Sequence, residues 1–364
     1  MKESFLSVGP TVQFSSVHRF AASALLAGPP TRQRGIMNTT WRLILWTVAI
    51  VGSPILMLSE THRFIPTVFY STYSFAHPPA LRIKPGDRVV TKTLDAGGSD
   101  ETGKQVASIG ANPEIGPFYV EGAEPGDVLV VTFEKIETNR KTSFSGSALS
   151  PYTADPQALL QRQPGQAPRV NWMIDKEKGT ARLEMPELMP SVMEFPLRPM
   201  LGCVGVAPAR KEAILSTTPG PWGGNMDYKG LNSGVKLMLQ VNEPGALLFM
   251  GDGHARQGDA EVVGTGMETS MDVEFTVDLI KKKTIGWPRL ENDEYVMILA
   301  SARPLLEAFQ HATTEMQRML VADYGFNERG AAAFMGQAVE YEIANVVDPS
   351  FTVVSKVRKS FLRR

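Results

Sequence analysis

The stretch GDGHARQGDAEVVGTGME, residues 251–268, combines residue types that could do chemistry with a spacing that would bring them together. Asp252 and His254 lie two residues apart between glycines, and side chains with this spacing point to the same side of an extended strand. A carboxylate and an imidazole on one face can bind a divalent metal ion. Asp259 and Glu261 repeat the spacing. The alternative that stays open is a glycine-rich β-turn carrying solvated acids.

Three other polar stretches interrupt apolar surroundings. Asp95 lies in TLDAGGSD, and Glu121 follows the apolar run of GPFYVEGAEPGD. Asn225 and Asp227 follow the glycine pair of PGPWGGNMD. Each is an ordinary loop residue by itself, but functional sites usually form where loops leave a rigid scaffold. Together these stretches predict a site built from polar side chains at strand ends.

The segments around these stretches have the pattern of β-strands. Residues 271–279 alternate strictly between apolar and polar side chains, and residues 234–241 alternate in the same way. The sequence PGD at 85–87 and again at 125–127 suits a type II turn, because proline fixes φ and glycine accepts a positive φ. Residues 139–170 are polar, contain several prolines and predict a long surface excursion over the site.

Helical periodicity appears only near the C-terminus. Residues 302–325 predict a helix with Pro304 near its start and Gly325 at its end. Asn327 is expected to cap a second helix that reaches about Asn345, and FTVVSKVRKS then alternates as a closing strand. This order predicts a mainly β fold with a sandwich-like or barrel-like body and a smaller α+β C-terminal portion. It does not fit a doubly wound sheet.

Composition narrows the classes of protein and partner. The chain has 364 residues, 43% of them hydrophobic, which is enough for a large core. Its net charge of −1 gives no sign of a nucleic-acid partner. The single cysteine, Cys203, cannot form an intrachain disulfide, and its apolar surroundings in LGCVGVAP predict a small buried hydrophobic residue.

An apolar run at residues 43–58 follows Arg42 and is short for a full membrane span. The pattern predicts an export signal or a membrane anchor within residues 37–60. The protein is therefore expected to be exported, periplasmic or membrane-anchored. It would be cytoplasmic if this segment is not a signal.

The rest of the chain divides by its pattern. Met37 could be the true start, which would leave the irregular N-terminal extension, residues 1–36, untranslated. We expect a β-rich catalytic body over residues 61–300. The C-terminal helical and strand portion, residues 301–364, is expected to pack on that body.

The motifs GPFYVEGAEPGDVLVV, GCVGVAP, PGPWGGNMD and GDGHARQGDAEVVGTGME together resemble the acetamidase/formamidase family, in order and in spacing, over about residues 66–360. The resemblance implies a β-sandwich-like body with an α+β C-terminal portion. It implies an enzyme that hydrolyses short linear amides to the carboxylate and ammonia. It also implies a homo-oligomer and a divalent metal ion, zinc or calcium.

Site residues also follow from the resemblance. The metal ligands that match best are Asp95, Asp252 and His254. Asp252 and His254 would also be catalytic, together with Glu121. The substrate pocket would be lined by the remaining motif residues, Trp222, Asn225, Asp227 and Glu261.

Trp222 departs from the family pattern, because many members carry a histidine at this position. Tryptophan neither binds a metal ion nor carries a proton, and it narrows a pocket, so we expect it to restrict the substrate. A further histidine expected in the first strand has no clear match. His77 precedes two prolines and is expected in a loop.

The function predicted from these features is metal-assisted amide hydrolysis. The reaction needs an activated nucleophile and a proton for the departing nitrogen, which a metal ion and a carboxylate can supply. The chain has no G-x-S-x-G elbow, H-E-x-x-H helix or phosphate loop. Two alternatives stay open: a non-catalytic, metal-stabilised binding protein of the same fold, which Trp222 favours, and a hydrolase of another C–N bond, such as a carbamate.

Overall fold

The structure is a computed structural model that describes residues 59–108, 110–160, 169–185, 187 and 191–362. The extension 1–36 and the apolar run 43–58, with the export signal or anchor predicted there, lie outside these residues. Among the residues that are described, no helix is long and apolar enough to cross a membrane.

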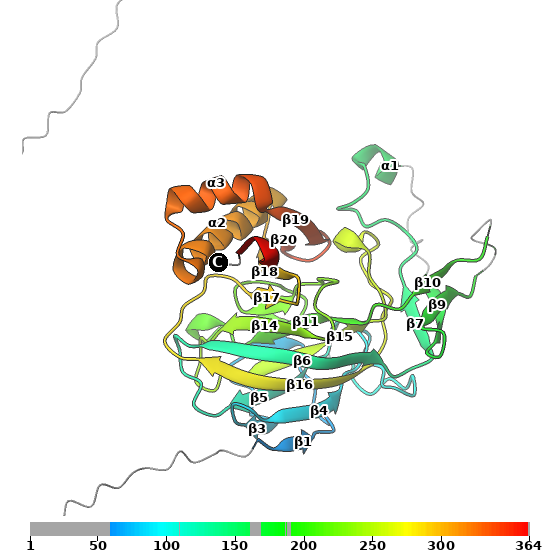
Figure 1. Ribbon diagram of the computed structural model, residues 1–364. Coiled ribbons are helices and arrows are strands. Elements are labelled where there is room, and N and C mark those ends of the chain that lie inside the picture. The colour runs from blue at the N-terminus through cyan, green and yellow to red at the C-terminus, as the bar shows by residue number, and fades with distance from the viewer. Residues whose placement is uncertain (1–58, 109, 161–168, 186, 188–190, 363–364) are drawn as a thin grey trace, which may run out of the picture. The chain divides into compact units, whose positions relative to one another are not determined.

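Two β-sheets make up the body of the protein (Figure 1). The larger has nine strands, in spatial order β1 (Thr61–Arg63), β4 (Arg88–Lys92), β16 (Met271–Ile280), β6 (Val128–Thr138), β14 (Val235–Gln240), β17 (Arg289–Glu291), β18 (Tyr295–Ala302), β20 (Phe351–Arg358) and β19 (Glu340–Asn345). The smaller has five, in the order β13 (Gly223–Asn225), β11 (Met200–Val206), β15 (Leu248–His254), β5 (Ile115–Val120) and β3 (Leu81–Ile83). The predicted mainly β fold is confirmed.

The two sheets share one hydrophobic core and so form a sandwich. Phe118 of β5 packs edge-on against Phe275 of β16, with ring centroids 5.2 Å apart. In β16, Val273, Phe275 and Val277 are buried while the residues between them are at least partly exposed, as the alternating sequence predicted. Burying one face of β16 fixes its register, because a slip of one residue would turn its apolar side chains outward.

The two PGD turns have the predicted backbone. Gly86 and Gly126 have φ values of 91° and 94°, in the left-handed region that a type II turn requires of its third residue. Each turn is closed by its buried aspartate. Asp87 accepts the backbone N–H of Lys84 at 2.8 Å, and Asp127 accepts that of Glu124 at 2.9 Å.

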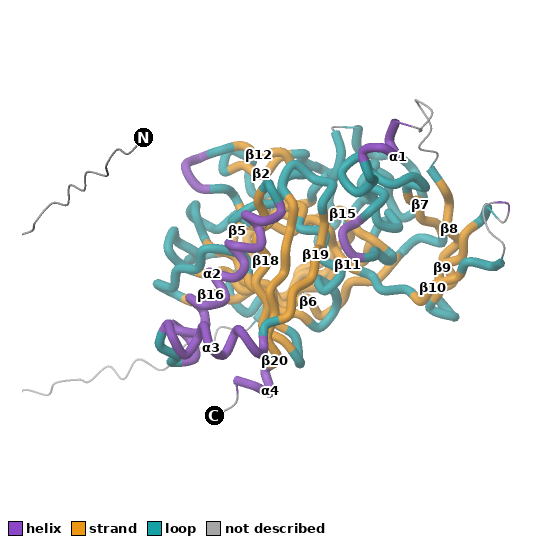
Figure 2. Tube along the Cα trace, turned by 90° about the horizontal axis from the view of Figure 1, so that it is seen from above, coloured by secondary structure: helices purple, strands orange, loops and turns teal. Residues whose placement is uncertain are grey.

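Two helices cover the outer face of the larger sheet at β18 and β20. These are α2 (Leu305–Tyr324) and α3 (Glu328–Ala338), which pack on the sheet through a second apolar cluster (Figures 1 and 2). Gly325 ends α2 with a left-handed φ of 72°, and the Asn327 side chain caps α3 by accepting the N–H of Gly330. Both caps were predicted. A short helix, α4 (Lys359–Leu362), follows β20.

The second helix is shorter than the sequence predicted. It ends at Ala338, and residues 340–345 form β19 instead. The physical reason is tertiary, since β19 pairs along β20 and completes the edge of the nine-stranded sheet. β18 itself crosses residue 300, so the body and the C-terminal portion share one continuous sheet.

The excursion predicted at 139–170 contributes to a small separate sheet. Its strands are β7 (Thr142–Ser145), β8 (Val170–Asp175), β9 (Thr180–Leu183) and β10 (Glu194–Pro196), and a short helix, α1 (Pro156–Leu160), lies between β7 and β8. These strands project from one side of the sandwich (Figure 1) and have their own apolar cluster. A two-stranded pair, β2 (Thr72–Ser74) and β12 (Ala213–Leu215), completes the described strands.

A buried ion pair joins α2 to the larger sheet and provides a test of the fold. Arg289 Nη2 donates to Glu315 Oε1 at 2.8 Å, and both residues are almost fully buried. Glu315→Ala should lower the free energy of unfolding by about 3–5 kcal/mol, because it leaves a buried guanidinium without one of its partners. The control is Glu212→Ala in the exposed pair Arg210–Glu212, which should cost less than about 1 kcal/mol. Denaturant unfolding of both variants measures this, and equal losses would contradict the proposed role of the buried pair.

Candidate functional site

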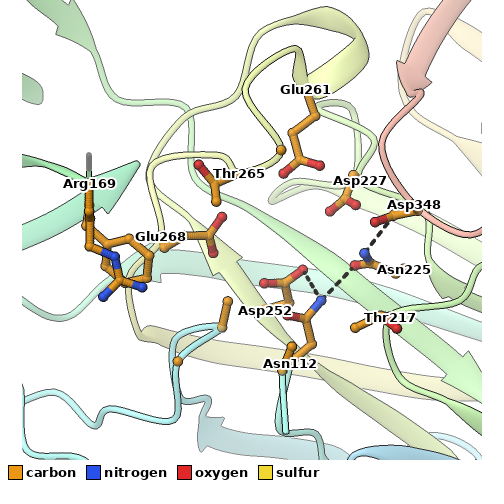
Figure 3. A pocket seen from close by; sticks show the side chains of 15 residues that line it. Asn112, Arg169, Thr217, Asn225, Asp227, Asp252, Glu261, Thr265, Glu268 and Asp348 are labelled. Carbon is orange, nitrogen blue, oxygen red and sulfur yellow. Dashed lines mark hydrogen bonds between the residues drawn. The ribbon is translucent and has the colours of Figure 1, made fainter. Parts of the chain in front are cut away.

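Five acids from separate stretches of the chain meet at one pocket (Figure 3), and four of them belong to groups that include His254. Asp252 and His254 lie on β15, Asp227 follows β13, and Glu261 ends a 3₁₀ turn at residues 259–261. Glu268 lies between that turn and β16, and Asp348 lies between β19 and β20. Three overlapping groups have ligand atoms within 4.8 Å of one another: Asp227–Asp252–His254, His254–Glu261–Glu268 and Asp227–Glu261–Asp348.

The orientation of the His254 ring is set by Gln257. The Gln257 Nε2 atom donates to the backbone oxygens of Asp227, at 2.6 Å, and Ala344, at 3.2 Å. Its Oε1 must therefore be the acceptor of the 2.8 Å bond to His254 Nδ1, which assigns the proton to Nδ1. This arrangement leaves Nε2 as the atom that faces the carboxylates, and a ring fixed in this way is typical of metal-ligating histidines.

Several polar atoms in this group have no hydrogen-bond partner. His254 Nε2 lies 3.1 Å from Glu268 Oε1 and 3.5 Å from Asp252 Oδ1, but without hydrogen-bond geometry. Both carboxylate oxygens of Asp227 and the Oε2 atom of Glu268 are buried and unpartnered. Buried charges are normally paired or coordinate a metal ion. The group therefore fits a cation, which would satisfy the imidazole nitrogen and the free oxygens together.

Burial and mutual repulsion shift the protonation of these groups. Burial, reinforced by the charge of Asp252, raises the pKa of Asp227 to about 6. Burial also raises the pKa of Glu268 to about 7, although His254 opposes the change. Burial alone would lower the pKa of His254, but the charges of Glu268 and Asp252 outweigh it and raise that pKa above its usual value. The buried acids therefore carry more negative charge than the nearby imidazole can balance.

The backbone is strained at three of the acids. Asp227, Asp252 and Glu261 have φ values of 45°, 56° and 48°, in the left-handed region that non-glycine residues seldom adopt. Asp252 is thus not extended, contrary to the geometry assumed from the sequence, although its carboxylate still reaches His254. Each such residue costs about 1–3 kcal/mol, and strain of this kind persists where the surrounding structure over-determines it.

A second layer of amides holds the acids in place. Asn112 Nδ2 donates to Asp252 Oδ2 at 3.1 Å and to Asn225 Oδ1 at 3.2 Å. Asn225 Nδ2 donates to Asp348 Oδ2 at 2.8 Å. Cys203 is fully buried, as predicted, and its thiol donates to Asn225 Oδ1 at 2.8 Å. Asn225 therefore positions other site residues across the smaller sheet.

The structure places Asp95 outside the three groups. Its Oδ2 atom accepts a 2.7 Å bond from Arg140 Nη2, and its Oδ1 atom accepts the N–H groups of Gly97 and Ser99. Both residues of this ion pair are buried. Asp95, which was expected to be a metal ligand, thus stabilises the loop after β4 instead. Residues 96 and 97 of that loop line the cavity described below.

Glu121 and Trp222 also lie apart from the acid group. Glu121 is exposed in the turn after β5, whereas the part of β15 nearest Asp252 pairs with the other end of β5, where Met250 lies opposite Ile115. Trp222 is partly buried among aromatic residues that include Tyr73 and Phe249, and it is not among the residues that line the cavity. Neither position has the contacts that the sequence reasoning assumed.

Glu268, Asp348 and Asn112 are site residues that sequence reasoning did not select. Glu268 closes the motif at 251–268, so a signal for it was present. It reaches the site because its backbone forms a β-bridge with His254. Asp348 and Asn112 stand in unremarkable local sequence, and only the packing of distant strands brings them here.

A cavity of about 290 Å³ opens beside the acids and lies near the lower end of the range for small-molecule sites. Asp227, Asp252 and Glu268 line one part of it. Phe144 of β7 and Arg169, just before β8, line another part, so the small projecting sheet supplies some of the wall. The excursion thus contributes to the site, as predicted.

Comparisons with known proteins agree with this architecture. A model of the acetamidase/formamidase family matches residues 73–218 and 210–357. The acetamidase of Mycolicibacterium smegmatis is 26% identical over 265 residues, which make up 56% of this chain and 64% of that protein. The formamidase of Methylophilus methylotrophus is 25% identical over 252 residues, with shares of 56% and 62%. The matched stretch therefore spans less than two thirds of either relative.

A solved structure is similar over most of its length. The crystal structure of an acetamidase from Yersinia enterocolitica is 32% identical in sequence, with a TM-score of 0.73. The match covers 84% of this chain and 94% of that chain.

Gly202 tests whether close backbone approach is needed to place the acids. A Cβ at this position would overlap Asp227 Oδ1 and Asp252 Oδ2. Gly202→Ala should therefore weaken the affinity for a divalent cation by about 10–100-fold, as expected when metal ligands lose their orientation. Gly258→Ala is the control, because no atom lies within 4 Å of its Cβ and its φ is an ordinary −85°. Calorimetric titration with zinc and with calcium, beside a melting curve for each folded variant, measures the effect. Equal affinity in the two variants would argue against these carboxylates as ligands.

Proposed function

The chain belongs to the acetamidase/formamidase family, and we propose that it hydrolyses a short linear amide to the carboxylate and ammonia. The relatives named acetamidase and formamidase support this substrate class. The observation that carries the proposal is the buried group of Asp227, Asp252 and His254 beside a cavity of suitable size, in which both Asp227 oxygens and His254 Nε2 have no hydrogen-bond partner.

We further propose a divalent metal ion as cofactor. His254 Nε2, with Asp227 and Asp252, offers one nitrogen and carboxylate oxygens, a donor set that suits zinc. The all-carboxylate group of Asp227, Glu261 and Asp348 suits calcium. When bound, such an ion would polarise the amide carbonyl and lower the pKa of a water molecule.

Glu268 is our candidate for proton transfer. Its Oε1 atom is held by the N–H of Gly266 at 2.8 Å, while Oε2 is free of hydrogen bonds, and the residue lines the cavity. A carboxylate in this position can accept a proton from the attacking water and deliver it to the departing nitrogen. Positioning by Gly266 would keep Oε2 directed at the reacting atoms.

His254→Ala tests the proposal at its centre. The variant should lose bound metal, and ammonia release should fall by more than about 100-fold, the lower end of the contribution of one catalytic group. His311→Ala is the control, because His311 lies on α2 with its side chain 41% exposed. Elemental analysis, melting temperature and ammonia release from formamide and acetamide are measured on all three proteins, with and without a chelator.

The outcomes separate the candidate functions. Equal metal content and equal rate in wild type and His254→Ala would contradict a metal site here. Loss of rate with metal retained would make His254 an acid–base or substrate-orienting group. Metal binding by a wild-type protein that releases no ammonia from any amide would favour the non-catalytic binding protein, and activity confined to carbamates would favour the other C–N hydrolase.

A further inference from the structure

Arg169 is a cation at the cavity that the chemistry of a neutral amide does not require. Its guanidinium carbon lies 3.4 Å from the centroid of the Phe144 ring, and the residue is exposed. Within the part of the chain that the structure describes, no carboxylate lies within ion-pair distance of it. Yet Arg169 lines the same cavity as Asp252 and Glu268, and Figure 3 shows it beside Glu268.

Main-chain pairing places the ring that stacks on this cation next to one of the acids. Phe144 and Glu268 form an antiparallel bridge and exchange both backbone hydrogen bonds, at 3.2 Å and 2.7 Å. Residues paired in this way carry their side chains on the same face, with Cβ atoms about 4.5–5.5 Å apart. The ring under Arg169 and the carboxylate of Glu268 are therefore neighbours in one wall of the cavity.

The β7–β8 pair holds Arg169 itself near this wall. Ser145 of β7 pairs with Val170, and Arg169 immediately precedes Val170. Stacking occupies one face of the guanidinium, which leaves its N–H edge available for hydrogen bonding. A planar edge of this kind binds a carboxylate through two parallel hydrogen bonds.

The other charged side chains around the cavity are acids, so the position of Arg169 affects which substrates can bind. Asp227, Asp252, Glu261 and Glu268 all line the cavity and would repel an anionic ligand. A positive group on the wall gives one place where a negative group can be bound. The volume of about 290 Å³ also leaves room beyond an amide the size of acetamide.

We propose that Arg169 binds a carboxylate of the substrate at the end opposite the scissile amide, so that the preferred substrate is a monoamide of a short dicarboxylic acid. The inference rests on the proposed amide hydrolysis. The oxygen of water bonds to the carbonyl carbon, the C–N bond breaks, and the nitrogen leaves as ammonia after taking a proton. The products at neutral pH are a dicarboxylate and ammonium.

The experiment compares kcat/KM for the monoamide of succinic acid with that for butyramide, a neutral amide of similar length. Wild type should prefer the anionic amide. Arg169→Gln should lower kcat/KM for the succinic monoamide by about 10–100-fold, mainly through KM, as expected for loss of a charge-assisted hydrogen bond. Its rate with butyramide should change less than about twofold. Arg169→Lys should keep part of the preference, because it retains the charge but not the planar edge.

Arg182→Gln is the matched control. Arg182 is an exposed arginine of β9 in the same small sheet and does not line this cavity. This variant should behave as wild type with both amides. Equal losses for both amides in Arg169→Gln would overturn the proposal and make Arg169 a counter-charge for the acids. A wild type that prefers butyramide would overturn it as well.

Binding separates this proposal from the proposed hydrolysis. Titration calorimetry with succinate measures anion binding without any turnover. Weaker succinate binding by Arg169→Gln than by wild type would support the carboxylate site. If, in addition, no amide released ammonia, that second finding would contradict the proposed hydrolysis but not the carboxylate site. Equal succinate binding by the two proteins, or none by either, would overturn the role of Arg169.

Discussion

Asp227 and Asp252 lie buried around the imidazole of His254, with ligand atoms within 4.8 Å of one another, and Glu268 lies 3.1 Å from the same ring. Burying like charges this closely is costly unless positive charge or hydrogen bonds compensate for it. Most features of the site are consequences of that cost. The raised pKa values of Asp227 and Glu268, the unpartnered oxygens and the fit to a cation all describe the same excess of negative charge.

The sandwich can tolerate this energetic cost because its hydrophobic core is large and its strands are held in register. Asp252 holds a left-handed backbone conformation inside β15, between Gly251 and Gly253, which pair with Cys203 and Leu201 of β11. Amide side chains connect the smaller sheet to the C-terminal strands, since Asn345 donates to the backbone oxygens of Asn225 and Met226, each at 3.3 Å. The site is thus held by both sheets, and its geometry depends on the stability of the whole sandwich.

In our proposal, the small projecting sheet adds substrate recognition to the site. It contributes Phe144 and Arg169 to the cavity but packs through its own apolar cluster. Binding groups on such an excursion can change with little cost to the core, whereas the acids around His254 cannot. A division between a fixed reaction centre and a separable recognition wall would let one scaffold act on amides of different chemistry.

The sequence by itself determined the local structure: the alternating strands, the PGD turns, the capped helix α2 and the spacing of Asp252 and His254. These follow from interactions over a few residues, which composition and periodicity report directly. Only the tertiary structure decided which strand ends meet. It brought Glu268 to the histidine and Asp348 to Asp227 and Glu261, paired Asp95 with Arg140, left Glu121 exposed at the far end of β5 and turned residues 340–345 into a strand. The reason is that sheet register and strand order depend on contacts between residues far apart in the chain, and no local pattern encodes them.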